Sequence, residues 1–408
     1  MKELTVSLIK ELASLYGDSF YILDSDVFES NCINLLSAFR KYYPKTNFAY
    51  SYKTNYIPKL GRIVNRLGGY AEVVSEMELG IAKRVGVSPE RIVWNGPVKS
   101  MEDIERFLLS GGSVNVDNLE EFSKVLDIAN RNPESLINLG IRCNYDVGDG
   151  VISRFGFDVN SEEIDETFST IASVKNLHLR NLHGHFAKRH FKYWPAKVRG
   201  LLDVYDRVTT VYKLEPECLD FGGGISGIMP DLLREQLMLE EFSFDDYATK
   251  SASIFQSYFE DQAARPWLFI EPGTAVAADC MRFICRVESI KTVREKTIIT
   301  TNGSQKNISN GGINLPLNII SVGEERQYVK NADIAGYTCI ESDYLFKNYS
   351  GEIGVGDYLV FGSCGSYSVV MKPPFICPNV SVIDISADTV EVIKRKELFD
   401  DVLCTYNF

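Results

Sequence analysis

The chain carries a lysine whose position suggests covalent chemistry. Lys53 ends an aromatic run, residues 48–53, that has the composition of a strand. A lysine at the edge of an apolar pocket loses hydration, so its pKa falls and the free amine can hold an aldehyde as a Schiff base. Taken alone, Lys53 is more readily explained as a surface lysine, so the chemical interpretation depends on residues further along the chain.

Two histidines and a glutamate supply the next reactive groups. His183 and His185 point to the same face of a predicted strand, because side chains of a strand alternate with a period of two. Either histidine alone favours a structural role, but the pair at one strand end makes a functional role equally plausible. Glu271 ends another predicted strand, and a carboxylate beside an aromatic nitrogen base would keep a proton on that nitrogen. A solvated loop glutamate is the alternative for Glu271.

Three consecutive glycines, Gly222, Gly223 and Gly224, follow a further predicted strand. Glycines let backbone N–H groups approach an anion closely, so a phosphate could bind there. The run is also compatible with a plain turn, since it lacks the full dinucleotide fingerprint and the lysine of phosphate-binding loops. An amine, a phosphate cradle, an imidazole and a carboxylate together describe a site for pyridoxal phosphate, whose protonated ring withdraws electrons from a substrate carbanion.

Eight short apolar segments, separated by stretches of helical periodicity, must position these groups. They predict an α/β fold, a (β/α)8 barrel over residues 26–274, with the active site at the carboxyl ends of its strands. Glu72 and Arg142 lie on two of these strands, beside the residues already named, and are predicted to contact the cofactor as well. The predicted strands are residues 47–51, 71–74, 91–94, 113–116, 138–143, 181–185, 218–221 and 267–271.

The pattern changes after residue 274. Segments rich in β-branched residues, separated by Gly, Asn and Asp, predict an all-β domain of residues 1–25 and 275–408. Residues 20–23 predict a strand that pairs into this later domain. Residues 1–17 have helical spacing but include Glu3 and Glu11, so they predict neither a signal peptide nor a membrane span.

Composition excludes several kinds of partner. The chain has 408 residues, a formal net charge of −12 and only 43 basic residues, which argues against nucleic acids and anionic membranes as partners. Its nine cysteines show no paired spacing, so we expect no disulfide framework and no metal site, and a reducing cytoplasm fits best. The expected partner is a small molecule.

Seven ordered motifs resemble those of the fold-type III pyridoxal-phosphate decarboxylases, which include the diaminopimelate, ornithine and arginine decarboxylases. The resemblance implies an alanine racemase-like barrel in which Lys53 holds the cofactor, His185 stacks on its ring and Glu271 faces its nitrogen. It further implies a homodimer with shared active sites, in which Cys339 of one subunit protonates the carbanion in the other. Tyr367 would reach the cofactor phosphate. The motifs are residues 50–55, 72–79, 183–185, 222–224 and 271–273, Cys339 with Asp343, and residues 364–367.

The chain departs from the family pattern at several positions. Ala187 and Lys188 replace a Gly-Ser pair after the stacking histidine, and Thr274 replaces an arginine, so Lys188 could restore the lost cation. After Cys339 stands Ile340, where diaminopimelate and ornithine enzymes have an acidic residue; Glu341 follows, then Asp343, and these three are the predicted substrate contacts. Residues 302–317 also lack the Arg-Pro-x-x-Tyr run of the diaminopimelate enzymes.

These departures lead to the functional prediction. We expect an enzyme that removes the α-carboxylate of an amino acid or an amino-acid-derived substrate, and that does not act on free diaminopimelate, ornithine or lysine, because a distal ammonium would lack a partner. An amino-acid racemase of the same fold is one alternative, although Glu271 disfavours it. A catalytically inactive regulatory homologue is the other.

Overall fold

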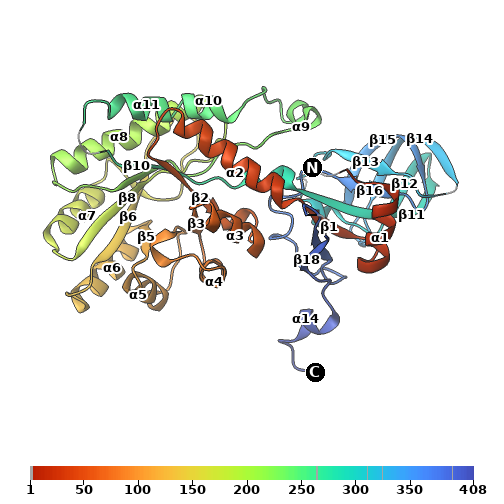
Figure 1. Cartoon of the computed structure of the whole chain (residues 1–408), viewed down its shortest axis with the longest axis horizontal. Coiled ribbons are helices and arrows are strands. Elements are labelled where there is room, and N and C mark those ends of the chain that lie inside the picture. The colour runs from red at the N-terminus through yellow and green to blue at the C-terminus, as the bar shows by residue number, and fades with distance from the viewer. Residues whose placement is uncertain (1–2, 263–264, 310, 324, 388) are drawn as a thin grey trace. The chain divides into compact units, whose positions relative to one another are not determined.

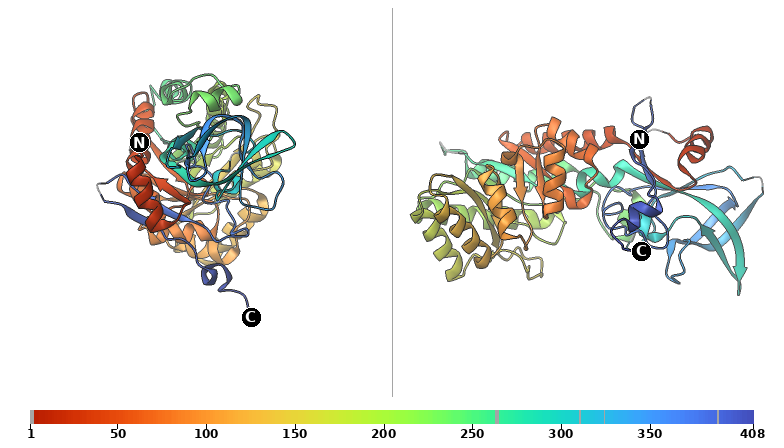
Figure 2. Two further views of the ribbon diagram at one scale, coloured as in Figure 1. Left: turned by 90° about the vertical axis from the view of Figure 1, so that its right-hand side faces the viewer. Right: turned by 90° about the horizontal axis from the view of Figure 1, so that it is seen from below.

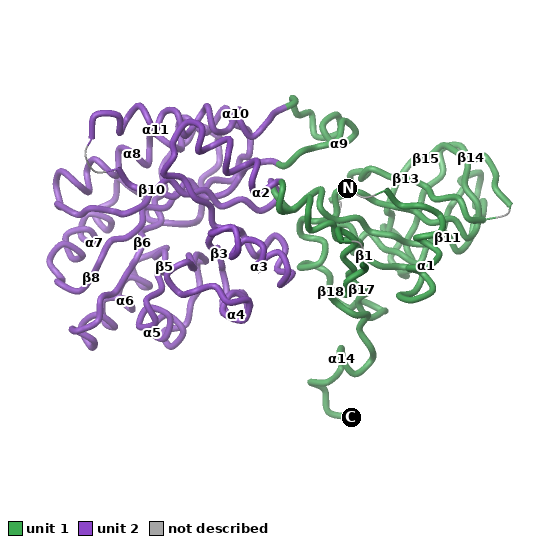
Figure 3. The backbone as a smooth tube through the Cα atoms, viewed as in Figure 1, with its two compact units in different colours: residues 1–30, 227–241, 276–408 green, residues 31–226, 242–275 purple. Residues whose placement is uncertain are grey.

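The computed structural model describes residues 3–262, 265–309, 311–323, 325–387 and 389–408. The chain forms two compact units (Figure 3): one of residues 1–30, 227–241 and 276–408, and one of residues 31–226 and 242–275. The division into a cofactor-binding domain of residues 26–274 and a β domain of residues 1–25 and 275–408 stays a prediction.

The unit of residues 31–226 and 242–275 is a closed barrel of eight parallel strands. Each strand pairs in parallel with its neighbour along the chain, and the last strand pairs with the first, Leu268 opposite Thr46. This confirms the predicted (β/α)8 barrel. The strands are β2 (Thr46–Ser51), β3 (Tyr70–Val73), β4 (Ile92–Trp94), β5 (Ser113–Val116), β6 (Ile137–Asn144), β8 (Leu177–His183), β9 (Cys218–Asp220) and β10 (Trp267–Ile270), and the short β7 (Phe157–Asp158) pairs in parallel with the end of β6.

Helices surround these strands (Figures 1 and 2). Several begin just after a strand, where a polar side chain accepts a hydrogen bond from a backbone N–H group in the first helical turn. Such caps fix where the strand ends and therefore where its last side chains project. Ser75, Ser100, Asn118 and Ser161 cap four helices in this way. The helices are α3 (Pro58–Arg66), α4 (Glu76–Arg84), α5 (Met101–Leu109), α6 (Leu119–Arg131), α7 (Glu162–Ser173), α8 (Trp194–Thr210), α10 (Phe244–Thr249) and α11 (Ala252–Tyr258), with α2 (Ser25–Arg40) before the first barrel strand.

The other unit is mostly β. Its early strand β1 (Phe20–Leu23) pairs antiparallel with β11 (Met281–Val293) and parallel with β17 (Ser381–Asp384), as the sequence suggested for residues 20–23. Helix α1 (Val6–Tyr16) buries Ile9 and Leu12 in the same apolar core as β1. The remaining elements are β12 (Lys296–Thr301), β13 (Leu317–Ile320), β14 (Arg326–Ala335), β15 (Tyr344–Gly354), β16 (Tyr358–Phe361), β18 (Glu391–Lys394), and the helices α9 (Asp231–Gln236), α12 (Thr274–Ala277), α13 (Gln305–Ile308) and α14 (Phe399–Leu403).

Strands β13, β14 and β15 are absent from the sequence-based prediction. The β14–β15 pair exposes many of its side chains, and two register shifts interrupt the ladder between Val329 and Ile334. An alternating apolar pattern is therefore weak there, because strand pairing rather than burial of one face defines these elements. Within the described part of the chain, no helix has the length and apolar character needed to cross a membrane.

Candidate active site

Side chains at the carboxyl ends of the barrel strands form one hydrogen-bonded network. Lys53 lies in a short 3-10 turn directly after β2, and its Nζ donates to Ser51 Oγ at 2.7 Å and pairs with Glu72 Oε2. Asn95, just after β4, donates through Nδ2 to Glu72 Oε1 at 3.0 Å and to Glu271 Oε1 at 2.5 Å. Lys53 and Glu271, which are 218 positions apart in the sequence (271 − 53), are thus joined through two side chains.

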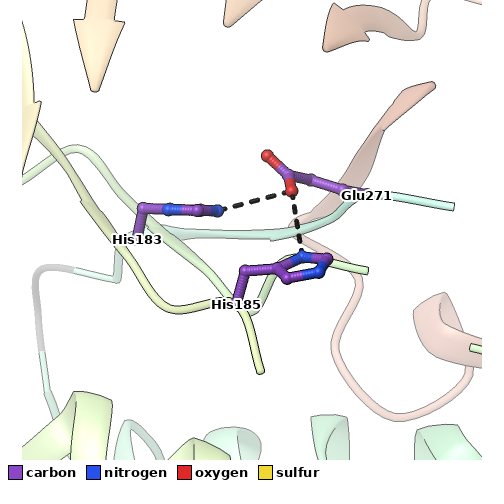
Figure 4. A group of neighbouring side chains, drawn as sticks. All are labelled: His183, His185 and Glu271. Atoms are coloured by element: carbon purple, nitrogen blue, oxygen red, sulfur yellow. Dashed lines mark hydrogen bonds and ion pairs between the residues drawn. The ribbon is translucent and has the colours of Figure 1, made fainter. Parts of the chain in front are cut away.

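Glu271 also meets the two predicted histidines (Figure 4). Its Oε2 lies 3.3 Å from His183 Nε2 and 3.7 Å from His185 Nδ1, and both rings turn toward the carboxylate. Burial works to raise the Glu271 pKa, but the nearby His183 ring outweighs it and holds that pKa well below its ordinary value. The carboxylate is therefore ionised at neutral pH.

The same three side chains have donor atoms close enough to hold a metal ion, within 4.8 Å of one another. Two imidazoles and one carboxylate are also a ligand set that divalent metals accept. A metal site does not require a lysine in the same network. The presence of Lys53 therefore favours a cofactor that carries an aldehyde over a metal ion.

His185 is a neutral imidazole. Burial lowers its pKa to about 4, and its Nδ1 accepts a hydrogen bond from the backbone N–H of Gly223 at 2.9 Å. The Nδ1 lone pair is used by this bond, so the approach to Glu271 is not an ion pair. The His185 side chain is nevertheless 31% exposed, which leaves an aromatic face of the ring available to a ligand.

Asp220 is a buried carboxyl group beside Glu271, and its surroundings favour the protonated form. Burial, and then the charge of Glu271, raise its pKa well above the ordinary value, whereas only the Gly222 N–H, at 2.9 Å from Oδ1, favours the ionised form. Its second oxygen is buried and has no partner among the described residues. The two neighbouring carboxyl groups thus favour a single negative charge between them, and that charge lies on Glu271.

The glycine run wraps closely around His185. A Cβ atom at Gly222 would lie 2.8 Å from both Gly184 O and His185 Nδ1, so only glycine lets the backbone pass there. At Gly224, where φ is +88°, a Cβ atom would lie 3.3 Å from Lys197 Nζ. Among the described residues, the backbone N–H groups of Gly224 and Ile225 have no acceptor. Free amides and a nearby cation suit an anion.

A chain of buried amides crosses the barrel interior behind Asn95. Asn115 Nδ2 donates to Asn95 Oδ1 at 2.7 Å, and Asn181 Nδ2 donates to Asn115 Oδ1 at 3.0 Å. Each amide therefore orients the next, so the NH2 group of Asn95 points at the two carboxylates. Gly140 makes room for the chain, because a Cβ atom there would overlap Asn115 Oδ1. Asn95 was not predicted from the sequence, although its place after a barrel strand was a usable signal.

Arg142 lies on β6, and its guanidinium contacts side chains outside the network of Lys53 and Glu271. Its guanidinium is 3.6 Å from Asp117 Oδ1 and packs on the Phe155 ring, 4.5 Å from the ring centroid. Burial lowers its pKa, which the charges of Asp117 and then Glu271 partly offset. The predicted cofactor contact of Arg142 stays a prediction.

The predicted site residues that follow residue 300 belong to the mostly β unit. Cys339 is a free, exposed thiol, and the side chains of Ile340 and Glu341 are also exposed. Asp343 is buried, and its two oxygens accept hydrogen bonds from Ser304, Gln305 and Thr338. Tyr367 adopts a positive φ of 62°. The structure thus gives Asp343 a role in shaping its loop, and the proposed contacts with substrate or cofactor stay predictions.

The positions that depart from the family pattern have a distinct arrangement. Lys188 is exposed, and its backbone oxygen accepts a hydrogen bond from Lys197 Nζ at 3.1 Å. Thr274 Oγ1 is 3.5 Å from the guanidinium of the exposed Arg189. Lys197 is a buried cation that borders the glycine run at Gly224, and its position on a helix gave no signal in the sequence.

Comparison with known proteins decides the family. The family described as "Pyridoxal-dependent decarboxylase, pyridoxal binding domain" matches residues 29–278. The chain belongs to this family. A diaminopimelate decarboxylase of Aquifex aeolicus is 24% identical over 97% of this chain and 93% of the relative, and one of Methanothermobacter thermautotrophicus is 26% identical over 96% and 92%. An L-glutamyl-[BtrI acyl-carrier protein] decarboxylase of Niallia circulans is 22% identical over 97% and 95%.

Solved structures of pyridoxal-dependent decarboxylases share the fold. A crystal structure of diaminopimelate decarboxylase from M. jannaschii superimposes with a TM-score of 0.86 at 22% identity, covering 98% of this chain and 94% of the other. The fold, the pyridoxal phosphate cofactor and the assignment to the carboxy-lyases are thereby confirmed. The family match also sets the racemase and the inactive-homologue alternatives aside.

One functional prediction is wrong. The sequence predicted that free diaminopimelate, ornithine and lysine are not substrates, but many relatives over nearly the full length of the chain are diaminopimelate decarboxylases. The exclusion rested on Ile340, a single loop position, and on a missing arginine run. A distal ammonium can find a carboxylate or carbonyl on any element that surrounds a pocket, so one apolar side chain does not exclude it.

Proposed function

We propose that the protein decarboxylates diaminopimelate at one α-carbon, with pyridoxal phosphate bound at the carboxyl ends of the barrel strands. The observation that carries this proposal is the network from Lys53 through Glu72 and Asn95 to the ionised Glu271. It contains the two groups that the chemistry requires, the partly exposed amine of Lys53 and the buried carboxylate of Glu271, in one hydrogen-bonded network. The names of the full-length relatives supply the substrate.

The residues present fit the cofactor. Gly224 and Ile225 offer backbone donors to a phosphate, and Tyr367 is the proposed further contact. The neutral ring of His185 offers an aromatic face to the pyridine ring, and Glu271 would hold a proton on its nitrogen. When bound, pyridoxal phosphate supplies the electron sink for the carbon that loses its carboxylate.

The chain's own residues would manage the protons. Ser51 and Glu72 orient Lys53 Nζ, which binds the cofactor aldehyde at rest and can carry a proton at Nζ during turnover. Protonated Asp220 adds no second negative charge beside Glu271, so the charge stays where the pyridine nitrogen would need it. The amide chain through Asn115 keeps Asn95 aimed at both carboxylates.

A direct assay tests the activity and the substrate. We expect purified protein loaded with pyridoxal phosphate to release one carbon dioxide for each lysine formed from diaminopimelate. Ornithine, arginine and lysine serve as comparison substrates at equal concentration, with carbon dioxide and product masses as readouts. Turnover of one of these in place of diaminopimelate would contradict the substrate, and no carbon dioxide from any of them would contradict the decarboxylase.

The proposal includes a homodimer with shared active sites. Cys339, exposed on its own unit, would enter the site of the partner subunit and return a proton to the carbanion, while Asp343 holds the loop that presents the thiol. Ile340 and Glu341 flank that thiol and would face the substrate. This assignment follows the family resemblance and the free state of the Cys339 thiol.

Subunit mixing tests the shared site. Lys53→Ala and Cys339→Ala should each be poorly active as homodimers, because each lacks one of the groups that handle protons. When the two are mixed and allowed to exchange subunits, mixed dimers regain one intact site out of two. Under random pairing, half of the dimers are mixed, and each mixed dimer has one intact site of two. We therefore expect activity to rise toward roughly a quarter of the wild-type value. A mixture no more active than the sum of its parts, with exchange verified by native mass spectrometry, would contradict the shared site.

The proposed compartment is a reducing cytoplasm. None of the nine cysteines, all of which the structure describes, forms a disulfide, and Cys339, Cys377 and Cys404 are exposed. Exposed thiols persist where glutathione and thioredoxin keep proteins reduced. The proposed proton transfer also needs Cys339 in its thiol form.

A further inference from the structure

Helix α8 places a buried lysine next to the glycine run. Lys197 lies in the first turns of α8 with only 1% of its surface exposed. Its Nζ donates to Lys188 O at 3.1 Å and lies 5.1 Å from the centroid of the Trp194 ring. A Cβ atom added at Gly224 would come within 3.3 Å of this Nζ, so the amine borders the loop directly.

Lys197 has no ion-pair partner among the residues that the structure describes. Among the described residues, no carboxylate lies within ion-pair distance of its Nζ, and the first turn of α8 contains no acidic residue. Burial accordingly lowers the Lys197 pKa to about 8, and Asp149 offsets this only in part. Buried ammonium groups are usually paired, because desolvation of an isolated charge is costly. An anion at the glycine run would supply the missing partner.

We propose that Lys197 binds the phosphate group of the cofactor and takes the place of the cation that other members carry at the position of Thr274. The inference rests on the proposed function, since it takes the glycine run as the phosphate site. Gly224 and Ile225, whose N–H groups have no acceptor among the described residues, lie on the loop that the Lys197 ammonium borders at Gly224. Lys188, which the sequence suggested for this role, is exposed and contributes its backbone oxygen as the acceptor that orients Lys197.

A ligand that lacks the phosphate separates this role from a structural one. Lys197→Met removes the charge and keeps the length of the side chain, while Lys188→Met is the matched control. The readout is the dissociation constant of each cofactor-free protein for pyridoxal phosphate and for pyridoxal, measured by absorbance after equilibrium dialysis. We expect Lys197→Met to weaken pyridoxal phosphate binding by about 10- to 100-fold, the range typical of a lost charge-assisted hydrogen bond. Its affinity for pyridoxal should change less than about twofold, which is below what one lost hydrogen bond produces.

The outcomes distinguish the possible explanations. Equal weakening for both ligands would show that Lys197 only shapes the loop, and an unchanged constant for pyridoxal phosphate would show that it does not contact the phosphate; either result overturns the inference. Wild-type protein that binds neither ligand would contradict the proposed function instead. Lys197→Gln keeps a donor for Lys188 O without the charge, so it replaces the methionine variant if that variant does not fold, and it should show the same selective loss.

Discussion

Lys53→Ala should lose the visible absorbance band of the lysine-bound cofactor and lower the decarboxylation rate by about 10³-fold or more, a loss typical of removing a nucleophile that also transfers protons. Lys53 Nζ is placed by Ser51 Oγ at 2.7 Å and by the buried Glu72, so the amine is held at one position. Alanine removes the amine and leaves the barrel strands intact. The measurements are the absorbance spectrum of the reconstituted protein and the rate of carbon dioxide release.

Two companion variants make this result specific to the amine. Lys53→Arg keeps a positive charge beside Glu72 but offers no amine that condenses with an aldehyde, so it should lose the band as well. Lys188→Met changes an exposed lysine, and its spectrum should match the wild type. A Lys53→Ala protein that keeps both the band and the turnover would place the covalent attachment at another lysine.

Glu271→Gln should lower kcat by about 10²- to 10³-fold while the cofactor remains bound, which is the scale of losing one preorganised electrostatic contact. Glutamine preserves the size of the side chain and an acceptor for Asn95, which donates to Glu271 Oε1 at 2.5 Å in the wild type. A neutral amide cannot hold a proton on the pyridine nitrogen, whereas the wild-type carboxylate is ionised because its pKa lies well below the ordinary value. The measurements are kcat and the nitrogen NMR shift of cofactor labelled at the ring nitrogen.

The nitrogen shift decides the cause of the loss. We expect the shift of a protonated nitrogen in the wild type and in Glu271→Asp, and that of an unprotonated nitrogen in Glu271→Gln. A slow Glu271→Gln enzyme with a protonated nitrogen would mean that Glu271 acts through His183 or Asn95 rather than on the ring. A fast enzyme with an unprotonated nitrogen would contradict the role of the charge altogether.

The sequence predicted the positions of functional residues best where these residues lie at the ends of regular strands. The active site of a barrel lies at the carboxyl ends of its strands, so the sequence alone could place Lys53, Glu72, His183 and Glu271 in one region. Each of the eight barrel strands was predicted within a few residues, because the strands are short, largely buried and separated by amphipathic helices. The weakest inference came from loops: Ile340 and a missing arginine run were taken to exclude diaminopimelate, the substrate that the names of the relatives give.

The sequence by itself determined the barrel, the cofactor and the chemical class, since these follow from local periodicity and from motifs in a fixed order. Only the tertiary structure decided the protonation states and the secondary contacts. The ionised Glu271 beside a protonated Asp220, the neutral His185, the orientation of Asn95 and the approach of Lys197 to Gly224 all depend on atoms from different strands and helices. The physical reason is that electrostatic and hydrogen-bond energies depend on distance and burial in space, and neither can be read from spacing along the chain.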